Sequence, residues 1–106
     1  MIKVILKEKD NHINYIKISG HANYGDFGYD IVCASVSSIA ITSVNAIIMN
    51  DRDSIKYQEA DGLLEIEIIK FNNFNDILIN NMINMLKELE KQYKKNIKIG
   101  RLNSWI

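Results

Sequence analysis

The chain has 106 residues, which is long enough for one domain with a single hydrophobic core, so we expect one domain over residues 1–106. Its 13 basic and 13 acidic residues give a formal net charge of zero, and this balance argues against direct binding to nucleic acid. A single cysteine forms no internal disulfide and no signal peptide is recognisable at the start, so we expect a cytoplasmic protein. Polar residues interrupt the apolar run 31–49, so we expect that it does not span a membrane.

The first 20 residues predict a β-hairpin. Residues 2–9 and 13–20 alternate apolar, largely β-branched side chains with polar ones, as strands with one buried face do. The polar segment between them contains His12 and predicts a turn. We expect the His12 imidazole to be solvated there.

Residues 30–50 predict an amphipathic helix with Asp30 as its candidate N-cap. Small polar side chains on one side would let another backbone approach closely. The broad apolar face consists of Val32, Val36, Ile39, Ala40, Val44, Ile47 and Ile48. Because this helix is apolar enough to be covered on more than one side, we expect a homodimer.

Three more elements follow in the second half of the chain. Asp61-Gly62 lies between two alternating runs in residues 54–70 and predicts a second hairpin. Residues 71–96 predict a second amphipathic helix and residues 97–102 a short last strand. The apolar stripe expected in the core comprises Phe74, Leu78, Met82, Met85, Leu89 and Tyr93. The order ββαββα, with a possible final strand, predicts an α+β fold: a two-layer sandwich of a mainly antiparallel sheet and two helices.

The segment SGHANYGDFGYDIVCASVSS (residues 19–38) joins the second strand to the first helix and carries both candidate catalytic groups. Cys33 falls in the first helical turn, where unpaired backbone N–H groups and the macrodipole favour negative charge and so the nucleophilic thiolate. His21 follows the strand, and if the loop folds back its imidazole meets the sulfur as a Cys–His pair. The amides at the helix start could also serve an oxyanion during acyl transfer.

The loop between these two groups is rich in glycine. Gly20, Gly25 and Gly28 permit positive φ and keep the loop mobile, which makes it a candidate lid over the thiol. The side chains available to orient or contact a substrate are Tyr24, Asp26, Phe27, Tyr29 and Asp30.

Other interpretations of the same residues stay open at this point. A lone cysteine near a helix start is often a small buried apolar side chain, and Asp30 can be an N-cap alone. A glycine-bearing loop before a helix can cradle phosphate, but no lysine follows, and Asp26 and Asp30 would repel an anion. A metal site of His21, Cys33 and an aspartate has fewer Cys and His ligands than Zn²⁺ usually takes, so we expect no metal and no cofactor.

The segment closely resembles the signature of the bacterial ribosomal-processing cysteine protease family, Prp. That signature runs Gly-His-Ala, a glycine-bearing acidic loop, Asp-Ile-Val-Cys-Ala and a serine one helical turn later. The matching positions are Gly20, His21, Ala22, Gly25, Gly28, Asp30, Ile31, Val32, Cys33, Ala34 and Ser37. The run SVNAII (residues 43–48), the chain length and the order of elements match as well, so the resemblance covers essentially the whole chain.

The resemblance implies a homodimeric cysteine endopeptidase that acts in ribosome maturation. Its substrate would be a large-subunit ribosomal protein, number twenty-seven in the bacterial series, from which it removes a hydrophobic N-terminal extension that ends in aromatic residues. Cys33 would be the nucleophile and His21 the general base, with Asp30 and Ser37 supporting them. The substrate-binding loop would comprise Gly20, Tyr24, Gly25, Asp26, Phe27, Gly28 and Tyr29.

An alternative of another class is a non-catalytic, ribosome-associated module whose glycine loop grips a ribosomal protein. Such a loop has no physical need for both His21 and Cys33, and the presence of the pair therefore favours the enzyme.

Overall fold

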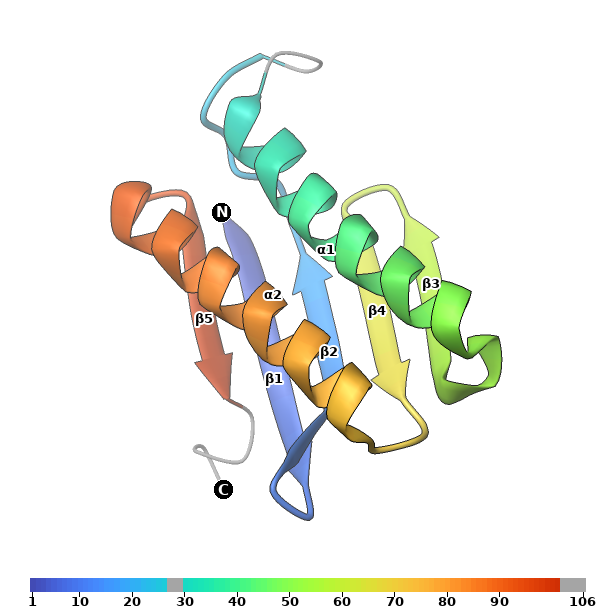
Figure 1. The fold of residues 1–106 in the computed structure, drawn as a ribbon. Coiled ribbons are helices and arrows are strands. Elements are labelled where there is room, and N and C mark those ends of the chain that lie inside the picture. Colours follow the sequence, from blue (N-terminus) through green and yellow to red (C-terminus); the bar gives the residue numbers. More distant parts are fainter. Residues whose placement is uncertain (27–29, 102–106) are drawn as a thin grey trace.

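A computed structural model describes residues 1–26 and 30–101 of the chain (Figure 1). Two helices lie over one face of a five-stranded sheet with the strand order β3-β4-β2-β1-β5. The elements are β1 (Ile2–Lys9), β2 (His12–Ser19), α1 (Ile31–Asn50), a short 3-10 helix η1 (Arg52–Ser54), β3 (Ile55–Ala60), β4 (Leu63–Ile68), α2 (Asn73–Gln92) and β5 (Ile97–Arg101). The predicted α+β sandwich is confirmed, including the final strand, which pairs with β1 in parallel while the other described pairs are antiparallel.

The two predicted hairpins form, and their turns follow from residue type. Asp10 and Asn11 both have positive φ, 52° and 64°, in the two-residue turn between β1 and β2. Gly62 has φ of 68° in the turn between β3 and β4, a value that glycine adopts without a steric penalty. Strand β2 pairs with β4 and thereby joins the two hairpins into one sheet.

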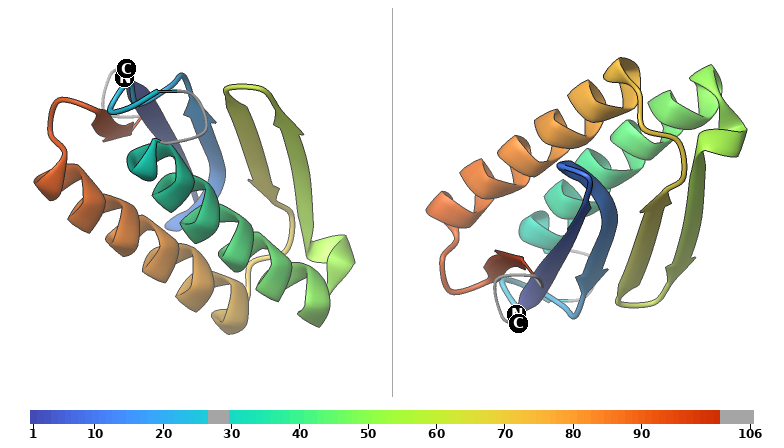
Figure 2. Two further views of the ribbon diagram at one scale, coloured as in Figure 1. Left: turned by 90° about the horizontal axis from the view of Figure 1, so that it is seen from above. Right: turned by 90° about the horizontal axis from the view of Figure 1, so that it is seen from below.

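The core lies between the sheet and the helices, which run side by side on the same side of the sheet in both views of Figure 2. Alternation along the strands sends one set of side chains to that face, for example Val4, Leu6, Ile16 and Ile66. The buried face of α1 is close to the predicted one and consists of Val32, Val36, Ala40, Ser43, Val44 and Ile47, with Ile39 and Ile48 partly buried.

The predicted buried stripe of α2 is wrong in part. Phe74 and Met85 are 42 % and 48 % exposed, whereas the buried positions are Asn75, Ile79, Met82, Ile83 and Leu86. The buried face of α2 is thus rotated about the helix axis relative to the predicted one. A contact at the start of the helix is consistent with this orientation: the buried Asn75 side chain points inward and donates to the Lys70 carbonyl at 3.0 Å. The helix also carries a second set of apolar residues at helical spacing, so the sequence pattern alone fits both faces.

Helix α1 is long and apolar enough to cross a membrane by length and composition alone. One such helix is weak evidence, because core helices of soluble proteins pass the same test. In this fold α1 packs its buried face against the sheet beside α2.

Candidate active site

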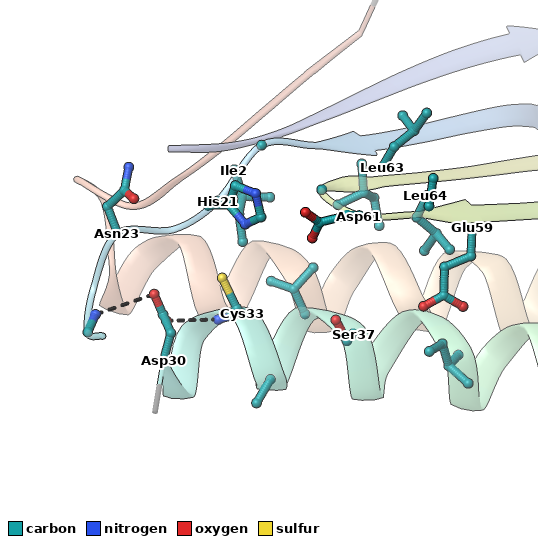
Figure 3. Close-up of a pocket in the computed structure, with 18 residues that line it drawn as sticks. Ile2, His21, Asn23, Asp30, Cys33, Ser37, Glu59, Asp61, Leu63 and Leu64 are labelled. Carbon is teal, nitrogen blue, oxygen red and sulfur yellow. Dashed lines mark hydrogen bonds between the residues drawn. The ribbon is translucent and has the colours of Figure 1, made fainter. Parts of the chain in front are cut away.

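A cavity of about 840 Å³ opens between the first half of α1, the end of β2 and the β3–β4 hairpin (Figure 3). Cys33, Ser37 and Ile41 line it from one face of α1, at successive helical turns. Its apolar lining comes from both layers and includes Ile2, Ile18, Val36, Leu63 and Leu64. The cavity is therefore a cleft with an apolar floor and a thiol at one end.

Cys33 is half-buried in the first turn of α1, as predicted. The Ala22 backbone N–H donates a hydrogen bond to the Cys33 sulfur at 3.3 Å. The sulfur therefore lies at the start of the helix with one backbone N–H donor directed at it. Ala22 is in turn held from the other side, because the Asn96 side chain donates to the Ala22 carbonyl at 2.9 Å.

Asp30 is the N-cap of α1, as expected. One carboxylate oxygen accepts from the backbone N–H groups of Val32 and Cys33, both at 3.0 Å. The other accepts from Tyr24 and Gly25 at 2.9 and 3.3 Å. Burial alone would raise the pKa of Asp30, but these four N–H donors together hold it below its usual value. Asp30 thus closes the loop onto the helix start and keeps its charge.

We expect Asp30→Asn and Asp30→Ala to separate the two tasks of this carboxylate. Asparagine keeps one acceptor for the helix cap and loses the acceptor that holds Tyr24 and Gly25, so peptide cleavage falls while stability changes little. Alanine loses both, and the free energy of unfolding falls by about 1 kcal/mol.

The charge of Asp30 should also make stability depend on pH. Because folding lowers the pKa of Asp30, its charge stabilises the fold at pH values above the ordinary pKa of 3.8, and this stabilisation disappears as pH falls through the folded-state pKa. Thermal unfolding of the three proteins between pH 7 and 3 measures this; a gap between wild type and Asp30→Ala that widens toward pH 3 would contradict it.

The helix-start amides that were considered as oxyanion donors from the sequence have acceptors within the chain in this structure. The N–H groups of Val32 and Cys33 donate to the Asp30 carboxylate, and that of Ala34 donates to the Asp30 carbonyl at 3.1 Å. The backbone donor beside the sulfur is instead Ala22 N–H. Sequence periodicity does not predict the contact between Ala22 N–H and the sulfur, because this contact depends on how the loop folds back on the helix.

His21 follows Gly20 at the end of β2, and Figure 3 shows its ring over the Cys33 sulfur at the same end of the cavity. The Gly20 N–H donates to the Gly62 carbonyl at 2.9 Å, so the strand end lies against the β3–β4 turn. A Cβ at Gly62 would lie 3.0 Å from His21 Nε2. No hydrogen bond joins the two described side chains of His21 and Cys33, and catalytic hydrogen bonds are often long before substrate binds.

Gly62→Ala is expected to lower cleavage more than its loss of stability explains. The added methyl group pushes against the His21 ring and sits at a φ of 68°, so the imidazole must move while unfolding becomes easier by about 1 kcal/mol. Asn11→Ala is the matched control, since φ is 64° there and the turn lies at the opposite end of β2. Peptide cleavage rates and thermal unfolding of both variants give the comparison; equal rate losses would argue against a role of Gly62 in placing His21.

The other predicted site residues divide into three groups. Ser37, Gly20 and Gly25 line the cavity together with His21, Asp30 and Cys33. Tyr24 and Asp26 are exposed and do not line it; the Tyr24 ring packs edge-on against Tyr93 with centroids 5.1 Å apart. Phe27, Gly28 and Tyr29 lie outside the described residues.

The β3–β4 hairpin supplies cavity residues that sequence reasoning missed. Glu59, Asp61, Gly62 and Leu64 line the wall opposite α1. The Asp61-Gly62 pair predicted the hairpin itself, but no sequence signal showed that its turn lies beside residues 20 and 21. Strand β2 pairing with β4, with Ser19 opposite Leu63, produces that placement.

The second histidine is not part of this cavity. His12 begins β2, stacks on Phe71 with ring centroids 4.6 Å apart, and has Nδ1 2.9 Å from an Asp76 carboxylate oxygen. The expectation of a solvated turn residue is therefore wrong, because α2 brings Asp76 to the strand. Within residues 1–26 and 30–101, no three His, Cys, Asp or Glu side chains group as metal ligands would.

Comparison with known proteins identifies the family. The family model described as cysteine protease Prp matches residues 1–98. The chain belongs to the Prp family of cysteine proteases. The resemblance seen in the sequence is confirmed, and so is the enzyme class.

Prp relatives match over nearly their whole length. The ribosomal processing cysteine protease Prp of Staphylococcus aureus is 33% identical over 104 residues, which covers 94% of this chain and 98% of the relative. A crystal structure of the essential S. aureus Prp in complex with a covalently linked product peptide matches with a TM-score of 0.89 at 30% identity, covering 95% of this chain and 99% of that one. A second S. aureus Prp structure, in complex with a substrate peptide, matches with the same identity and coverage and a TM-score of 0.83.

Proposed function

We propose that this Prp-family protease is an endopeptidase that acts in ribosome maturation in the cytoplasm. Its substrate is the large-subunit ribosomal protein number twenty-seven of the bacterial series, from which it removes the N-terminal extension. The observation that carries the proposal is that Cys33 and His21 lie at one end of a peptide-sized cleft. The names of the S. aureus relative and of its peptide complexes support it.

The proposed mechanism uses Cys33 as nucleophile and His21 as general acid and base. The Cys33 thiolate forms an S–C bond to the scissile carbonyl carbon while the carbonyl oxygen takes up the negative charge. Ala22 N–H donates to the Cys33 sulfur at 3.3 Å, and it can transfer this hydrogen bond to the oxyanion once the sulfur has bonded to carbon. As the C–N bond breaks, protonated His21 gives its proton to the leaving amine, and a thioester remains.

Hydrolysis of the thioester completes the cycle. His21, now neutral, takes a proton from a water molecule whose oxygen attacks the thioester carbonyl. The S–C bond breaks, the N-terminal peptide leaves with a new carboxyl group, and Cys33 returns to its thiolate form. Asp30 supports these steps by fixing the helix start and residues 24–25. Ser37 lies one turn further along the cleft, where it can contact substrate.

The lining of the cleft supports a substrate with bulky apolar residues near the cut. Ile18, Val36 and Leu64 contribute apolar surface to the cleft, and an apolar side chain gains about 25 cal/mol for each Å² that it buries there. The resemblance to Prp led us to expect an extension that ends in aromatic residues, and such residues would occupy this surface.

A mass-spectrometric assay tests the proposed substrate. Purified protein is mixed with a peptide that copies the N-terminal extension and the first mature residues of the cognate ribosomal protein. A single cut after the aromatic residues is the expected result. Peptide that stays bound but intact would instead support the non-catalytic binding module.

We also propose a homodimer, supported by apolar side chains left exposed on the helix layer. Ile31 and Met49 of α1 and Ile77 and Met85 of α2 are between 48% and 87% exposed. A groove of about 570 Å³ lies between the start of α1 and the end of α2 on this layer. Sedimentation equilibrium of the wild type and of Met85→Glu measures whether this face holds two copies together.

A further inference from the structure

The wall of the cleft opposite α1 carries carboxylates. Along β3, alternate side chains point to the helix side of the sheet, so Glu59 shares that face with Ile55 and Tyr57. Figure 3 shows Asp61 near His21 and Glu59 farther along α1, beyond Ser37. Both line the cavity, and neither takes part in an ion pair within residues 1–26 and 30–101. The cleft wall thus carries two carboxylates that have no lysine or arginine partner among those residues.

The Glu59 carboxylate is held in position by its neighbour on the strand. The Tyr57 hydroxyl donates to Glu59 Oε2. Burial, this hydrogen bond and the carboxylate charge raise the pKa of Tyr57 to about 12, so the hydroxyl keeps its proton and remains a donor at neutral pH. A donor to one oxygen leaves the other oxygen able to accept from a ligand. A carboxylate fixed in this way loses little side-chain entropy when a cation binds.

The distance along the cleft sets which substrate position Glu59 can reach. Cys33, Ser37 and Ile41 span two turns of α1, which is about 12 Å. An extended peptide advances about 3.3 Å per residue, so about three or four residues lie between the cleaved bond and the far end of this face. Figure 3 shows Cys33 toward one end of the cleft and Glu59, paired with Leu64 across the hairpin, toward the other.

We propose that Glu59 is a specificity-determining residue that selects a lysine or arginine three or four residues from the cleaved bond. The inference rests on the proposed function, because it assigns one position of the peptide that the same cleft cuts. A charge-assisted hydrogen bond from the basic side chain to Glu59 raises kcat/KM by about tenfold over an uncharged residue at that position. Asp61, nearer to His21, faces residues closer to the cut.

The test is a charge scan of the substrate peptide. Peptides carry Lys, Gln or Glu at each of the third and fourth positions on both sides of the cleaved bond. Wild type should prefer Lys over Gln by about tenfold at one of these positions and disfavour Glu. Glu59→Gln keeps an acceptor for Tyr57 and should remove the preference, so that the ratio of the Lys-peptide rate to the Gln-peptide rate falls to about one. Glu59→Lys should make Glu the preferred residue.

The control is Glu67→Gln, since Glu67 is an exposed carboxylate on the opposite face of the sheet from the cleft. It should keep the preference for Lys. The inference is overturned if wild type cuts the Lys and Gln peptides equally at all four positions, or if the preference survives in Glu59→Gln. Asp61→Asn separates the two cleft carboxylates: loss of the preference in that variant alone would move the role to Asp61.

A binding measurement keeps the inference separate from the proposed reaction. Fluorescence anisotropy of the same labelled peptides with Cys33→Ala reports affinity without chemistry. If wild type cuts no peptide, the proposed function fails, and a Lys preference in binding that is absent from the Cys33→Ala, Glu59→Gln double variant still supports the role of Glu59. Equal affinities for the Lys, Gln and Glu peptides would overturn it.

Discussion

Cys33→Ala should abolish cleavage of the extension peptide, with a rate loss of about ten-thousand-fold or more. The variant lacks the single thiol of the chain, while the cap of Asp30 and the apolar lining stay in place. Removing the half-buried sulfur leaves a small gap and frees the Ala22 N–H, so a modest fall in thermal stability is also expected. Peptide affinity should remain close to that of the wild type. Mass spectrometry over several hours, with anisotropy for binding, measures both quantities.

Two further variants make this result specific. Cys33→Ser keeps the shape of the side chain and replaces the thiolate by a hydroxyl, which is a far weaker nucleophile at neutral pH, so its activity should also be very low. Ser38→Ala changes an exposed residue of the same helix that lies in the other groove, between α1 and α2, and should cut at the wild-type rate. Cleavage by Cys33→Ala at even a hundredth of the wild-type rate would remove Cys33 from the role of nucleophile.

His21→Ala should slow cleavage by about a hundred- to ten-thousand-fold, the range typical of a general acid or base. The side chain is exposed at the end of β2, so its loss should change the free energy of unfolding little. The same variant should slow alkylation of Cys33 by iodoacetamide near neutral pH, because it removes the neighbouring imidazole that can accept the thiol proton. Cleavage rates by mass spectrometry and alkylation rates by intact mass give the two readouts.

His12→Gln is the matched control for this variant. It removes the stacking on Phe71 and the contact with Asp76, so it should lower stability without affecting cleavage at temperatures where the protein is folded. Added imidazole should restore part of the activity of His21→Ala, because it can enter the space left at the exposed position and carry protons. Absence of both the rate loss and the rescue would show that His21 has no part in proton transfer.

Local patterns were sufficient to predict most of the fold. The alternation of residues 2–9, the Asp61-Gly62 turn and the Asp30 cap each specify an element through contacts only a few residues apart, and all three are as expected. The buried face of α2 was not predictable in this way, because two apolar sets fit a helical period and the contact of Asn75 with Lys70 decides between them.

Only the part of the candidate site that comes from residues close together in the sequence was predictable. His21, Asp30 and Cys33 lie within 13 residues of one another, so their approach followed from one loop folding back. The wall formed by Glu59 and Gly62 depends on the pairing of β2 with β4, which joins residues more than 40 positions apart. The hydrogen bond from Ala22 N–H to the Cys33 sulfur was not predictable either, because every residue except proline has a backbone N–H and only the folded loop decides which one lies beside the sulfur.

The hydrogen bond from Asn96 to the Ala22 carbonyl has a consequence for when the protein becomes competent during its synthesis. Chains emerge from the ribosome with the N-terminus first, so His21 and Cys33 are available long before Asn96 is made. Until then the residue whose N–H contacts the sulfur lacks its anchor, and β1 lacks β5, the strand that follows Asn96. We therefore expect a partly made chain to carry a thiol with an incomplete site, and to gain peptidase activity only after Asn96 and β5 have been synthesised.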